Sequence, residues 1–232
     1  MLLLLLLLLV LCCCQSDASF LYRRQSFSWR ASLDCCTGIA SSFEQSIFSP
    51  KEASKTTTLP STSETIAFVE HEFCSYPRFL EKFSLTLGFC RVLPSSKHHF
   101  DLRFSILPVT LLRFGEPQIS KTNHAICVQI PVVGGLLAKI NPNSTDNGSL
   151  SFTWYQEMRS ECNPPKITVV TKIAGNYKPS IAGSRRPVPC WRNKFYCTTQ
   201  RLFHEYVMYR FHDFVLKEFE KLLTHQSSTL MK

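Results

Sequence analysis

The C-terminal third of the sequence contains two histidine–acid pairs, which are residue types suited to catalysis or metal binding. They are His204 with Glu205 and His212 with Asp213. A zincin-type zinc site needs two histidines four residues apart on one helix, so that both imidazoles reach the same metal. Here the histidines are eight residues apart, which on a helix separates them by about 12 Å. The spacing predicts no metal site, and we expect both histidines on the flank of a helix.

The other histidines and cysteines carry no catalytic or metal-binding signature. His98 and His99 precede a strand-like run, in which neighbouring side chains point to opposite faces. Cys127 and Cys197 have no accompanying histidine motif, and none of the six cysteines after residue 65 forms a CxxC pair. We therefore expect structural cysteines, no catalytic residue, no metal and no cofactor.

The segment from Ile130 to Ala138 contains a pair of glycines, Gly134 and Gly135, between two apolar runs. Two glycines permit a tight bend and the close approach of another backbone segment. The pair has two interpretations: it lines a ligand entrance, or it kinks a strand so that a sheet can curl over a helix. Neither phosphate-binding pattern, GxGxxG or GxxxxGK, is present.

A basic stretch without acidic residues runs between Glu161 and Glu205 and contains eight lysines and arginines. Such a stretch suits an anionic partner. Basic and aromatic residues together can meet a membrane at head-group depth or stack on a nucleic acid, or they can be ordinary surface. Ordinary surface is the favoured interpretation, with anion or membrane contact as the alternative, and nucleic acid binding is not expected. The candidate contact residues are Arg185, Arg186, Trp191, Arg192 and Lys194.

Two N-glycosylation sequons lie close together in a turn-rich segment, at Asn143 and Asn147. They are acceptor sites if the chain passes through the endoplasmic reticulum.

Hydrophobic alternation predicts the elements that would position these residues. Six strand-like runs are expected in an antiparallel sheet with one solvated face, and a short helix is expected at 76–83. The runs are 66–73, 85–89, 100–106, 126–132, 150–154 and 167–173. After the prolines at 187 and 189 the period changes to that of an amphipathic helix over 199–223, with an extension back to Pro189 left open.

The N-terminus has the composition of a targeting segment. Residues 1–19 contain an apolar run of thirteen residues, too short for a transmembrane helix but typical of a cleaved signal peptide. Residues 20–65 are rich in Ser, Thr and Arg, and we expect them to be a disordered transit-like segment or linker. A signal followed by such a segment, with Ala18, Ser19 and Phe20 around the cut, resembles the bipartite plastid presequence of algae with complex plastids. The alternatives are a retained anchor, or a secreted or endomembrane protein with a disordered tail.

The remaining residues, 66–232, are expected to form one α+β domain, a curved antiparallel sheet of about six or seven strands packed on a long C-terminal helix. This order of elements resembles the helix-grip architecture of START and Bet v 1-like domains, with a lipocalin-like barrel as the rival. The resemblance implies a hydrophobic ligand, such as a lipid, pigment or isoprenoid, between sheet and helix. An enzyme on the same scaffold and a peripheral binder of anionic membranes are the alternatives. The candidate cavity residues are Phe104, Ile130, Gly134, Gly135, Trp154, Phe203, Val207 and Phe211.

Overall fold

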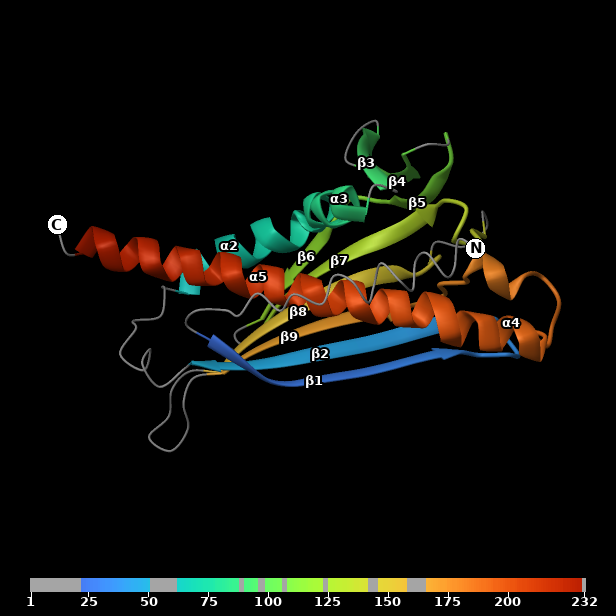
Figure 1. The fold of residues 1–232 in the computed structure, drawn as a ribbon, viewed down its shortest axis with the longest axis horizontal. Coiled ribbons are helices and arrows are strands. Elements are labelled where there is room, and N and C mark those ends of the chain that lie inside the picture. The colour runs from blue at the N-terminus through green and yellow to red at the C-terminus, as the bar shows by residue number, and fades with distance from the viewer. Residues whose placement is uncertain are drawn as a thin grey trace.

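A large antiparallel sheet with helices along one face forms the framework of the protein (Figure 1). The computed structural model describes residues 22–50, 62–87, 90–95, 99–105, 108–122, 125–141, 146–157 and 166–230. The strands are β1 (Tyr22–Leu33), β2 (Ala40–Pro50), β3 (Cys90–Ser95), β4 (His99–Phe104), β5 (Thr110–Phe114), β6 (Gln118–Lys121), β7 (Ala125–Gly134), β8 (Ser149–Glu157) and β9 (Lys166–Ala174). The helices are α2 (Thr62–Cys74), α3 (Tyr76–Leu87), the 3₁₀ turn η2 (Ser180–Ala182), α4 (Cys190–Phe195), the π-helical η3 (Tyr196–Gln200) and α5 (Arg201–Leu230).

The strand order is β1-β2-β9-β8-β7-β5-β4-β3, and β6 pairs with β7 beside this path. Neighbouring strands in this order are antiparallel. Because β1 and β3 form the two ends of the order, the sheet is open. The α+β class, the antiparallel sheet and the long C-terminal helix are as expected, whereas the nine described strands exceed the expected six or seven.

The β1–β2 hairpin corrects the expectation that residues 20–65 lie outside the fold, because residues 22–50 form two strands of the main sheet. Here β2 pairs along Ser42–Phe48 with β9. Hydrophobic alternation did not predict these strands, because the inward side chains of β2 include the polar residues Ser42, Glu44 and Ser46. The folded domain therefore includes Tyr22 and does not begin at residue 66.

The run at 66–73 is also corrected, since it lies in helix α2 and not in a strand. Thr65, Val69 and Phe73 are buried and are spaced four residues apart, which places them on one face of a helix. The short apolar run fits both periods, so periodicity alone does not separate helix from strand here. The expected helix at 76–83 is confirmed as part of α3, and this helix also takes Leu85 and Leu87 from the expected strand at 85–89.

The predicted C-terminal helix is confirmed, and helical structure runs without a break from Cys190 through α4, η3 and α5. Its start follows Pro189, which suits the position before the first turn because proline cannot donate a helical hydrogen bond. Figure 1 shows α5 lying along the sheet, with α2 and α3 on the same side. Among the described residues no helix is both long and apolar enough to cross a lipid bilayer.

The core between α5 and the sheet is rich in aromatic rings. Phe211 is fully buried, and its ring centroid lies 5.0 Å from those of Tyr76 and Phe152 and 5.1 Å from that of Phe79. Trp154 and Phe219 pack edge to face at 5.1 Å. Rings in these tilted and edge-on arrangements stabilise one another beyond the burial of their surface, by about 0.5–1.5 kcal/mol per pair.

Candidate functional site

A row of polar side chains on β2 faces the helix side of the sheet. Alternate residues of a strand point to the same face, and in β2 these are Ser42, Glu44 and Ser46, with 7%, 1% and 0% of their surface exposed. Burying a carboxylate is costly unless other groups bond to it. The partners of these side chains are two histidines of α5, His204 and His212. A threonine of β9, Thr171, bonds the second histidine, so three elements far apart in the sequence meet at one polar cluster.

His212 is the fully buried histidine of this cluster. Its Nδ1 lies 2.8 Å from Ser46 Oγ and its Nε2 lies 2.8 Å from Thr171 Oγ1, and the residue is fully buried. Burial, followed by the positive charges of Arg24 and His204, lowers the pKa of His212 to about 3. A neutral imidazole has one donor and one acceptor nitrogen, and the two hydroxyls satisfy both. His212 therefore holds β2, β9 and α5 together, and its buried position corrects the expectation that it lies on a helix flank.

His204 is the accessible end of the cluster. Its Nε2 lies 3.1 Å from Ser42 Oγ and 3.4 Å from Glu44 Oε1. The Ser42 hydroxyl also donates to Glu44 Oε2 at 3.4 Å. The side chain of His204 is 21% exposed, whereas that of Glu44 is 2% exposed. We call Ser42, Glu44 and His204 the acidic triplet.

The acidic triplet has the residue types of a hydrolase but not its geometry. In a serine hydrolase one imidazole nitrogen contacts the serine while the other is held by the acid. Here serine and glutamate both contact Nε2 of His204. Within the described ranges, the group able to hold a metal ion is Asp34, Cys35 and Cys36, in the β1–β2 turn, and not this cluster. The triplet is thus arranged to accept and donate hydrogen bonds.

The negative charge of Glu44 acts on the aromatic core. Burial, and next the charge of Glu44, raise the pKa of the Tyr76 hydroxyl, and the Tyr76 ring packs against Phe152 and Phe211. The interior beneath α5 therefore places acidic and hydroxyl groups beside an apolar, ring-rich region.

The candidate cavity residues fall into separate groups. Ile130, Trp154, Val207 and Phe211 are buried members of one apolar core cluster. Phe104 lies on β4, opposite Cys90, and is not among the members of that cluster. Phe203 lies in α5, and its side chain is outside those described.

The two glycines of the candidate set have a backbone role. Gly134 ends β7, while Gly135 has a φ of +113° and its backbone closely approaches Leu111 and Leu112. A side chain at Gly135 would meet the Leu111 carbonyl oxygen at 2.4 Å, whereas one at Gly134 would have ordinary contacts. The geometry matches the interpretation of a bend with close backbone approach.

The five candidate anion-contact residues divide between structural and exposed positions. Arg186 donates hydrogen bonds to the carbonyl oxygens of Thr37, Gly183 and Arg185, so its guanidinium is used within the fold. The guanidinium of Arg192 lies 5.0 Å from the Trp191 ring centroid. Arg185, Trp191 and Lys194 are exposed.

Of the two sequons, Asn143 lies outside the described residues. Asn147 is described and its side-chain oxygen accepts a hydrogen bond from the backbone N–H of Asn141 at 2.8 Å.

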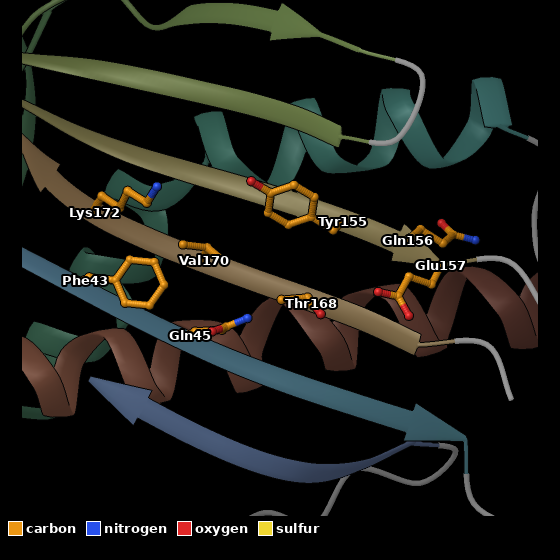
Figure 2. Close-up of a pocket in the computed structure, with 8 residues that line it drawn as sticks. All are labelled: Phe43, Gln45, Tyr155, Gln156, Glu157, Thr168, Val170 and Lys172. Carbon is orange, nitrogen blue, oxygen red and sulfur yellow. The ribbon is translucent and has the colours of Figure 1, made fainter. Parts of the chain in front are cut away.

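The opposite face of the sheet carries an open depression of about 640 Å³. Figure 2 shows its side chains standing on β2, β9 and β8, with the helices behind the sheet. The Lys172 ammonium lies 5.5 Å from the ring centroid of Phe43. The lining residues are Phe43, Gln45, Tyr155, Gln156, Glu157, Thr168, Val170 and Lys172. This depression is separated from the acidic triplet by the thickness of the sheet.

Comparison with known proteins gives no match, either to a protein-family model or to a curated protein. The site must therefore be interpreted from its own chemistry.

Sequence reasoning considered the two histidines but not the four β-strand residues that bond to them. Ser42 and His204 are 162 positions apart, and Ser46 and His212 are 166 apart. The sequence did contain one signal. His204 and His212 recur at helical spacing with the apolar residues Met208, Val215 and Phe219, so they lie on the apolar face of the helix. A histidine on a buried helix face needs polar partners.

Proposed function

We propose that the protein binds a hydrophobic ligand that carries a hydrogen-bonding head group, such as a lipid, pigment or isoprenoid alcohol, between the sheet and α5. The observation that carries the proposal is the acidic triplet, a buried Glu44 carboxylate beside a partly exposed histidine in an interior that is otherwise largely apolar and contains many aromatic rings. Ligand sites are mostly apolar and contain a few polar groups that fix orientation.

The chemistry of the triplet specifies the head group. A carboxylate accepts up to four hydrogen bonds, and the contacts of Glu44 with Ser42 and His204 are both 3.4 Å long. A ligand hydroxyl would donate to Glu44 and form a shorter, charge-assisted bond. The apolar part of the ligand would then lie against the rings around Tyr76 and Phe211.

The proposal is tested with retinol, a fluorescent isoprenoid alcohol, and with retinyl acetate, which has no hydroxyl donor. Wild-type protein should bind retinol saturably. Glu44→Gln should weaken retinol binding by about tenfold to hundredfold, because a hydrogen bond to a charged group contributes about 1.5–3 kcal/mol. The same variant should leave retinyl acetate binding unchanged.

Gln45→Ala is the matched control, because Gln45 is the next residue of β2 and its side chain lies on the opposite face, in the outer depression. It should bind both compounds as the wild type does. Equal weakening by Glu44→Gln and Gln45→Ala, or the absence of saturable binding to the wild type, would refute the proposal.

A further inference from the structure

The short helix α4 presents an aromatic and basic surface to solvent. Trp191 is 60% exposed, the highest fraction among the exposed large hydrophobic side chains in the described ranges, and Phe195 is 36% exposed. They are four residues apart and therefore lie on the same side of the helix. Lys194 is exposed on α4, and Arg185 is exposed on the segment that precedes it. We call Arg185, Trp191, Lys194 and Phe195 the α4 surface.

Charge favours an anionic partner for this surface. The acid-free stretch between Glu161 and Glu205 contains the whole of α4 and η3. Asp34, in the β1–β2 turn, lies close enough to Arg186 for that charge to lower its pKa, although hydrogen bonds from Thr37 and Cys36 lower it more. Since Arg186 is bonded to backbone carbonyls, Arg185 and Lys194 are the cations available to a partner.

The aromatic residues distinguish a bilayer from a merely anionic partner. Tryptophan prefers the boundary between head groups and acyl chains, where its ring is half buried and its N–H stays hydrated. Lysine and arginine near this depth keep their charges at the head groups. A tryptophan, a phenylalanine and a lysine on α4, with an arginine on the segment before it, match this arrangement.

We propose that the α4 surface docks the protein on anionic membranes, with Trp191 and Phe195 entering the interface and Arg185 and Lys194 contacting lipid phosphates. The site does not depend on the ligand proposed above. It lies at the same end of α5 as His204, which follows Phe195 by nine residues along a continuous helical segment, or about 14 Å. Docking would thus bring the end of α5 that carries His204 close to the bilayer.

Vesicle sedimentation tests the proposal, with phosphatidylcholine vesicles compared with vesicles that also contain phosphatidylglycerol. The wild type should bind the anionic vesicles, and the binding should weaken as salt rises and screens the charges. Arg185→Glu with Lys194→Glu should weaken binding at least about tenfold, since each basic residue near an anionic surface contributes about 1 kcal/mol. Trp191→Ala with Phe195→Ala should also weaken it.

The matched control reverses two exposed arginines elsewhere, Arg23→Glu with Arg91→Glu. Arg23 follows Tyr22, whose N–H bonds Glu220 near the other end of α5, and Arg91 lies on β3. This variant has the same net charge as the docking variant and should bind vesicles as the wild type does. Equal loss in both charge variants, equal binding to neutral and anionic vesicles, or binding to single-stranded nucleic acid without vesicle binding would overturn the proposal.

Retinol binding separates this proposal from the ligand proposal. The α4 variants should keep wild-type affinity for retinol in solution, and Glu44→Gln should keep wild-type vesicle binding. A shift of tryptophan emission to shorter wavelength on vesicle addition, absent in Trp191→Phe, would place Trp191 in the interface.

Discussion

The buried His212 should make the stability of the protein strongly pH-dependent. The folded state keeps His212 neutral down to about pH 3, whereas an unfolded histidine titrates near about pH 6.5. Below about pH 6.5 the unfolded state binds the additional proton, so stability must fall as pH falls. The contribution of His212 is fully present above about pH 6.5 and is lost progressively down to about pH 3.

The magnitude follows from the two protonation equilibria. About pH 4.5 is two pH units below the pKa of an unfolded histidine, so the imidazole is almost fully protonated in the unfolded state. This protonation lowers the free energy of unfolding by about 3 kcal/mol relative to neutral pH. The exact folded pKa does not alter this value as long as it lies well below 4.5. The expected loss is a large fraction of the about 5–15 kcal/mol that stabilises a typical domain.

The assay is urea unfolding at about pH 7 and about pH 4.5 for the wild type and His212→Gln. Other titrating groups contribute equally to both proteins, so the difference between their pH responses isolates His212. That difference should be about 3 kcal/mol. Phe211→Leu is the control, since it perturbs the neighbouring buried position without removing a titrating group, and it should keep the wild-type pH response. Equal pH responses in His212→Gln and the wild type, or an NMR titration of the His212 ring near neutral pH, would refute the reasoning.

Three further predictions concern the triplet, the glycine pair and the N-terminus. Glu44→Leu with His204→Leu should raise the free energy of unfolding by about 1–4 kcal/mol in urea titrations, because apolar residues in place of the buried Glu44 carboxylate and its histidine partner remove the desolvation cost of the carboxylate; a loss of stability would instead show that the triplet stabilises the fold. Gly135→Ala should lower stability by at least about 1–3 kcal/mol because of its positive φ and the contact with Leu111, whereas Gly134→Ala should shift the thermal midpoint little; similar midpoints would contradict the backbone role. Mass spectrometry of protein from its native source should find a mature chain that retains residues 22–50, since these form two strands of the sheet; a mature start between Ser54 and Ile66 would show that the fold forms without them.

The C-terminal helix and the central strands could be predicted from sequence because their buried faces are apolar. Val207, Phe211 and Val215 recur at helical spacing, and Ile126, Val128 and Ile130 alternate in β7. The β1–β2 hairpin could not be recognised in this way, because the inward face of β2 includes serine and glutamate whose partners lie on α5. The same long-range pairing explains why the acidic triplet was missed, since sequence periodicity carries no information on which distant element will supply a hydrogen-bond partner.

The central claim is that an amphipathic ligand lies between the sheet and α5 with its head group at Glu44. Photo-crosslinking with a long-chain alcohol that carries a diazirine near its hydroxyl, followed by peptide mass spectrometry, tests this claim most directly. Labelling should concentrate on the inward residues around Ser42 and Glu44 of β2 and on α5 near His204, and an excess of retinol should suppress it. Labelling confined to Phe43, Tyr155 and Lys172 on the outer face, or labelling that retinol does not suppress, would contradict the claim.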